Sequence, residues 1–211
     1  MIKRKLLTLA ILLVSIAPGA TGRTIPAGTF FDHFVLGVEW GYTQCVFQTR
    51  NYNFISEEGY RVYEKNSAFY AHANAQILAN IGYRLSEQVT LSLYSGYIGV
   101  GTQNRLIPVL LRASYFPYTD SEDGWFGYAQ GGTAWHVHST QGRMAWLATL
   151  GGGYRLRLST DARLDLLVGL KYLHDHPSIP NPEGPGNVPE HNIRKNNAGY
   201  CALDISLAIS F

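Results

Sequence analysis

Residues 197–211 read NAGYCALDISLAISF and end the chain. From Cys201 onward, alternate residues are apolar and the residues between them are small or polar. Because successive side chains of a strand point to opposite faces, this period of two predicts a β-strand with one apolar and one polar face. Such a strand is typical of the last strand of a transmembrane β-barrel, with lipid on one side and a polar lumen on the other. The alternative is an edge strand of a soluble β-protein.

The first residues of the chain predict export. Lys3, Arg4 and Lys5 are basic, Leu6–Ile16 is apolar, and Ala20–Gly22 is a run of small residues. This order is that of a secretory signal peptide over residues 1–22. No later segment reaches the about 20 apolar residues that a membrane-spanning helix needs, so a membrane location requires strands. Residues 23–211 therefore form the predicted barrel domain.

The composition fits this class of protein. The sequence has 22 Gly, 14 Tyr and a formal net charge of +2. Barrel strands are half polar, so their mean hydropathy is moderate. The charge is too small to predict a nucleic-acid partner.

Eight amphipathic segments predict the fold. They cover approximately residues 34–43, 68–84, 89–98, 107–116, 125–136, 144–158, 163–173 and 197–211. Residues 45–67, 99–106, 137–143 and 174–196 are expected to be loops at one end, and residues 85–88, 117–124 and 159–162 shorter turns at the other. An even strand number with long loops at one end predicts an all-β, eight-stranded, antiparallel, up-and-down transmembrane barrel.

With its terminal Phe211 after alternating apolar residues, the chain resembles the small outer-membrane barrels of the OmpA/OmpX type. The resemblance implies a monomer in the outer membrane of a Gram-negative bacterium, in contact with lipid and lipopolysaccharide. It also implies that the barrel-assembly machinery binds the strand that ends at Phe211. It implies little about activity, because this architecture serves many functions.

Aromatic residues are expected at the two membrane interfaces. Ten residues of a strand tilted by about 40° advance about 25 Å, which is close to the height of the apolar band. Trp125 and Trp135 would then lie at opposite interfaces. Trp40, Tyr172 and Phe211 complete the predicted set.

Charged residues are predicted to face the lumen. They are Glu39, Arg112, Arg155, Arg157, Asp165, Lys171 and Asp204. Counting along the strands places Lys171 beside Asp204, Asp165 near Arg155 and Arg157, and Glu39 close to Asp204. An eight-stranded barrel has room only for side chains, and buried ions must pair. The main prediction is a salt-bridged plug, and the alternative is a narrow solute pore.

His136, His138 and Ser139 form a cluster that could include a nucleophile and its base. Some barrels that this chain resembles deacylate lipid A with a His and a Ser at the end of a strand. The order His-Val-His-Ser departs from their His-x-Ser pattern, and no acid is evident nearby. A lipid A acyl hydrolase that uses Ser139 with His136 or His138 is nevertheless the enzymatic alternative to a non-enzymatic barrel.

The remaining candidates are weaker. Histidines 174, 176 and 191 have no fixed metal geometry, and no metal or cofactor is predicted. Cys45 and Cys201 lie near the seam between the first and last strands, but on opposite faces, so a disulfide would need a bulge. The loops 45–67 and 174–196 are candidate surfaces for a ligand. The main functional prediction is a structural or ligand-binding barrel without catalytic activity.

Overall fold

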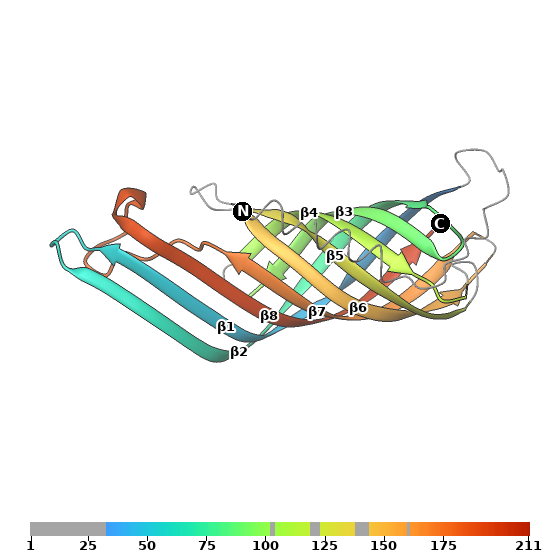
Figure 1. The fold of residues 1–211 in the computed structure, drawn as a ribbon, viewed down its shortest axis with the longest axis horizontal. Helices are drawn as coiled ribbons and strands as arrows, with labels where there is room; N and C mark the ends of the chain where they lie inside the picture. Colours follow the sequence, from blue (N-terminus) through green and yellow to red (C-terminus); the bar gives the residue numbers. More distant parts are fainter. Residues whose placement is uncertain (1–32, 102–103, 119–122, 138–143, 160) are drawn as a thin grey trace.

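The computed structural model describes residues 33–101, 104–118, 123–137, 144–159 and 161–211. Its strands are β1 (Phe34–Ile55), β2 (Arg61–Arg84), β3 (Val89–Val100), β4 (Asn104–Tyr115), β5 (Gly124–His136), β6 (Ala145–Arg157), β7 (Arg163–Asp175) and β8 (Ile193–Ser210). A short 3₁₀ helix, η2 (Glu190–Asn192), precedes β8. Each strand pairs antiparallel with the next, and β1 pairs with β8 to close the ring (Figure 1). The prediction of an eight-stranded antiparallel barrel is confirmed.

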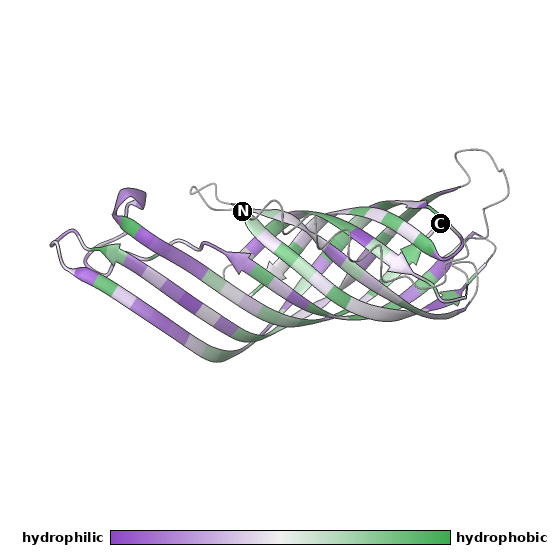
Figure 2. Ribbon diagram, viewed as in Figure 1, coloured by the Kyte–Doolittle hydropathy of each residue, from purple (hydrophilic) through white to green (hydrophobic). Residues whose placement is uncertain are grey.

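The outer wall of the barrel is apolar. Its side chains include Val38, Ile81, Leu111, Leu150, Leu170 and Ile205, which are between 40% and 67% exposed. Figure 2 shows hydrophobic and hydrophilic residues alternating along the barrel strands. A water-soluble monomer rarely exposes so continuous an apolar surface, so this wall is suited to lipid. Among the described residues, no helix is both long and apolar enough to cross a bilayer.

Three strands continue past one end of the barrel. β3 pairs with β2 only from Gln76 to Arg84, and β7 pairs with β8 only as far as Ala198. β1 remains paired with β2 as far as Ile55 and with β8 as far as Phe54. Residues 47–55, 61–69 and 193–197 therefore form a three-stranded sheet, here called the extension, which projects from the barrel (Figure 1). We call this end of the barrel the extended end and the opposite end the turn end.

The prediction that residues 45–67 form a loop is wrong. Only Ser56–Tyr60 connects β1 to β2, and the flanking residues are strand. The extension is solvated on much of both faces, so its residues lack the apolar alternation by which the barrel strands are recognised. The expected loop 174–196 is also shorter, because β7 reaches Asp175 and β8 begins at Ile193.

The extension has a small core of its own. Phe54, Val62 and Ile193 lie on its inner face and pack against Ile179 and Val188 of the β7–β8 connection. This contact holds residues 176–189 against the extension. The extension and the connection therefore form one folded unit outside the barrel.

A carboxylate fastens this connection to the β1–β2 turn. Glu183 accepts hydrogen bonds from the hydroxyl groups of Ser56 and Tyr60. These hydrogen bonds, with that of Ser56 the strongest, lower the pKa of Glu183 below its ordinary value. The hydrogen bond to Glu183 likewise raises the pKa of Tyr60. The turn and the connection are thus held together by an ionised glutamate.

Candidate functional site

The lumen is organised in layers along β7. Alternate residues of this strand face inward, in the order Asp165, Leu167, Gly169, Lys171, Leu173 and Asp175 from the turn end to the extended end. Asp165, Lys171 and Asp175 each belong to a different polar layer. Because β7 is a single continuous strand, their order along the chain is also their order along the lumen.

Glu39 and Arg112 form the central ion pair. Arg112 Nη1 lies 2.7 Å from Glu39 Oε2, and both side chains are almost fully buried. Arg112 also donates to the Tyr94 hydroxyl at 3.0 Å and to Gln130 Oε1 at 2.6 Å. Its guanidinium carbon lies 4.1 Å from the centre of the Tyr94 ring and 4.5 Å from that of Tyr128. Hydrogen bonds and aromatic faces thus surround the cation on several sides.

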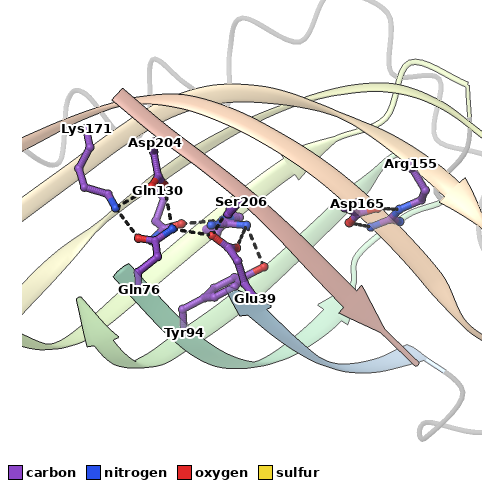
Figure 3. Close-up of polar contacts among 10 residues, drawn as sticks. Glu39, Gln76, Tyr94, Gln130, Arg155, Asp165, Lys171, Asp204 and Ser206 are labelled. Carbon is purple, nitrogen blue, oxygen red and sulfur yellow. Dashed lines mark hydrogen bonds and ion pairs between the residues drawn. The ribbon is translucent and has the colours of Figure 1, made fainter. Parts of the chain in front are cut away.

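A second ion pair lies next to the first, toward the extended end (Figure 3). Lys171 Nζ is 3.2 Å from Asp204 Oδ1, and it donates to Thr43 at 2.9 Å and to Gln76 Oε1 at 2.6 Å. The Gln76 amide nitrogen donates to Asp204 at 3.1 Å and to Glu39 at 3.3 Å. Gln76 therefore links the two ion pairs into one network.

The neutral members of this network were not predicted from the sequence. They are Thr43, Gln76, Tyr94, Gln130 and Ser206, of which Ser206 donates to Glu39 at 2.9 Å. Their inward parity was readable from the sequence. Their partners were not, because they come from strands far apart in the chain.

The third ion pair is at the turn end. Arg155 binds Asp165 through two hydrogen bonds of 2.7 Å, and its guanidinium lies 4.3 Å from the centre of the Phe116 ring. Arg157 was expected beside this pair, and that expectation is wrong. It is exposed at the end of β6, where its side chain donates to the Ser159 carbonyl. β6 ends at Arg157, so a side chain with inward parity at this position lies past the end of the lumen.

An apolar layer closes the lumen between Lys171 and the extended end. It includes Ile98, Leu106, Leu147, Leu173 and Tyr200, which are at most 4% exposed. Protein interiors packed in this way leave little room for water. The ion pairs are thereby separated from the extended end.

His136 and Asp175 form a polar pair beyond this apolar layer. His136 Nε2 lies 2.8 Å from Asp175 Oδ1, and Asp175 is fully buried. The backbone N–H of His176 donates to the same oxygen at 2.7 Å. Asp175 is an acid next to His136 that was not evident from the sequence, because residues 174–196 were expected to form a loop. His138 and Ser139 lie outside the described residues.

The two cysteines are free. β1 has a bulge between Cys45 and Phe47, and Cys45 is buried while Cys201 is exposed on the outer wall. Cys45 pairs with Ala202, so in spite of the bulge the two thiols lie on opposite faces of the sheet. The described residues hold no group of three or more His, Cys, Asp or Glu side chains suited to a metal ion.

The predicted interfacial aromatics all lie on the outer wall. Trp125 and Trp135 lie at opposite ends of β5, and Phe211 is joined to Leu36 by two backbone hydrogen bonds at the turn end. Trp40 differs, because it pairs with Ile77 and Leu207 within the aliphatic band. A hollow of about 660 Å³ in this wall is lined by Trp40, Trp125, Tyr154, Val168 and Ile205, among others.

Comparisons with known proteins returned structures only. No family model and no curated protein matches the sequence. The outer membrane protein OprG of Pseudomonas aeruginosa is similar with a TM-score of 0.49 at 10% identity, covering 85% of this chain and 96% of OprG. The outer membrane protein AlkL, in lipid bilayers, has a TM-score of 0.47 at 13% identity, covering 89% of this chain and 94% of AlkL. The outer membrane protease OmpT of Escherichia coli has a TM-score of 0.45 at 9% identity, covering 90% of this chain and 99% of OmpT. The fold of this chain follows from its own strand pairing.

Proposed function

We propose that this chain is a non-enzymatic, integral outer-membrane barrel that presents the extension to a ligand at the cell surface. The observation that carries the proposal is the extension itself. Long loops of outer-membrane barrels face the exterior and their short turns face the periplasm. On that rule, the extended end faces outward and the turn end faces the periplasm.

The packing of the lumen supports a binding role over transport. The ion pairs from Asp165 to Lys171 and the apolar layer around Leu173 fill the barrel along β7. A solute would have to break buried ion pairs, each of which costs several kcal/mol to separate. The closed barrel then serves as an anchor, and the surface outside it is available for binding.

Cysteine labelling on intact cells tests the orientation. Glu58→Cys lies in the exposed β1–β2 turn, and Glu87→Cys lies in the β2–β3 turn at the other end. A membrane-impermeant maleimide is expected to label Glu58→Cys on intact cells and Glu87→Cys only after lysis. The unmodified chain, in which Cys45 is buried and Cys201 lies on the outer wall, is the control for background labelling. Labelling of Glu87→Cys alone on intact cells contradicts the proposal.

One observation supports an enzymatic alternative, a lipid A acyl hydrolase. The contact between His136 and Asp175 is of the kind that orients a catalytic histidine, and Ser139 follows three residues later. If this alternative holds, cells with the Ser139→Ala variant retain an acyl chain on lipid A that cells with the unmodified protein lose. Mass spectrometry of lipid A distinguishes the two cases, and identical spectra with and without the protein exclude the hydrolase.

A further inference from the structure

The outer face of the extension continues the lipid-facing wall of the barrel. Strand register gives its successive rows, because residues directly opposite one another on paired strands share a face. The first row beyond the bulge is Phe69, Phe47 and Cys201, in which Cys201 still pairs with Tyr172 of the barrel and Phe69 is 81% exposed. The next row is Ser67, Thr49 and Gly199. The face thus changes from apolar to polar within two rows.

The rows farther from the barrel are basic. They are Lys65, Asn51 and Asn197, followed by Tyr63, Asn53 and Lys195. Arg61 joins them, since its Nε donates to Asn53 Oδ1 at 3.1 Å. We call these seven residues the basic face. None of the rows contains a carboxylate, and Glu64, the nearest acid in the sequence, lies on the opposite face, where the Tyr52 hydroxyl binds it.

The basic face also offers groups that bind sugars. Lys65, Lys195 and Arg61 are exposed, and Tyr63 is 60% exposed. Cations, amides and an exposed aromatic ring together suit an acidic saccharide.

The order of these rows identifies the source of the saccharide. Exposed phenylalanines border the membrane-facing wall, and the cations follow at greater distance from the barrel. An amphiphile with acyl chains and phosphorylated sugars has the same order of groups. We propose that the basic face binds the phosphorylated core sugars of lipopolysaccharide whose acyl chains lie in the same membrane, beside Phe47 and Phe69. The inference rests on the proposed function, because it requires the extension to lie outside the cell.

Binding of purified lipopolysaccharide tests the proposal. The full chain, purified from outer membranes in a neutral detergent, is titrated with fluorescent rough lipopolysaccharide that has a phosphorylated core. The Lys65→Gln/Lys195→Gln variant is expected to bind on the order of tenfold more weakly or worse, because each cation near an anionic surface contributes substantially. The matched control is Arg50→Gln/Arg157→Gln, which removes the same charge from the inner face of the extension and from the turn end. It is expected to bind within about twofold of the unmodified chain.

Two further ligands test the phosphate groups and the lipid. The two double variants should bind dephosphorylated lipopolysaccharide with the same affinity. The water-soluble core oligosaccharide should bind more weakly than the intact molecule, and equal binding overturns the assignment to a membrane-anchored ligand. Equal affinity of the Lys65→Gln/Lys195→Gln and control variants also overturns the inference. If Glu58→Cys is nevertheless labelled on intact cells, the proposed function stands and only this inference fails.

Discussion

At the residue scale, the lumen depends on paired charges. Lys171→Met leaves the Asp204 carboxylate without a cation in a closed interior, and is expected to lower the free energy of unfolding by about 3–5 kcal/mol. Adding Asp204→Asn should restore part of this loss, because the double variant has no unpaired charge. Urea unfolding in lipid vesicles, followed by tryptophan fluorescence, measures both effects. If the losses in unfolding free energy of the two single substitutions simply add in the double variant, the two residues are not coupled.

Gly41 shows how closely two strands can approach at the seam of the barrel. A Cβ at this position would lie 2.3 Å from the Ile205 carbonyl oxygen and 2.6 Å from Ser206 Cα, both of which are backbone atoms. Gly41→Ala is expected to destabilise the barrel by about 1–3 kcal/mol through this overlap. Gly127→Ala is the control, because the nearest neighbouring atom to its Cβ would be 4.0 Å away. Similar unfolding midpoints for the two variants would contradict the prediction.

At the element scale, the extension is expected to be separable from the barrel. Gln48 pairs with Ala68, so an Asn-Gly turn can replace Thr49–Ser67 as a two-residue hairpin. The β1–β8 pairs from Gly37 to Cys45 remain, and these close the barrel. The shortened chain should retain heat-modifiable migration on electrophoresis. It should also lose lipopolysaccharide binding. Failure to fold would show that the extension contributes to barrel assembly.

The contact between Glu183 and the β1–β2 turn is expected to depend on pH. Its pKa is lowered in the folded state, so its stabilising contribution is complete above the pKa of an unfolded glutamate and is lost as the pH falls through the lowered value. Hydrogen exchange in residues 176–189 should therefore increase on acidification below the ordinary glutamate range. Glu183→Gln removes the ionisable group and should show no such increase from this contact. An equal increase in both chains would assign the pH dependence to other groups.

At the scale of the whole molecule, a packed lumen predicts a barrel that does not conduct ions. The unmodified chain should produce no conductance steps in a planar bilayer. Leu106→Ala/Leu110→Ala/Leu173→Ala removes part of the apolar layer and should introduce ion permeation. The matched control, Leu93→Ala/Leu111→Ala/Leu170→Ala, removes the same atoms from the outer wall and should remain silent. Conductance by the unmodified chain would favour the narrow pore.

The whole molecule also shows how far sequence patterns reach. Alternation at Leu203, Ile205 and Leu207 predicted the strand, because the side-chain period of a strand depends only on neighbouring residues. It also predicted which side faces outward, because a membrane barrel has an apolar outer wall and a polar lumen. The same parity placed Glu39, Lys171 and Asp204 inside the barrel. Each of these properties depends only on residues near one another in the chain.

Only the tertiary structure decided which side chains meet and where the strands end. Gln76 joins Glu39 to Asp204 across three strands, and Asp175 meets His136 because β7 continues one pair of residues beyond its clear apolar pattern. The extension remained hidden for a related reason. Its strands are held by backbone pairing across β2, β1 and β8 and by a few apolar contacts around Phe54, and backbone hydrogen bonds leave no periodic signal in the side chains. The amphipathic barrel was thus determined by local sequence, whereas the extension beyond the barrel was determined by strand register.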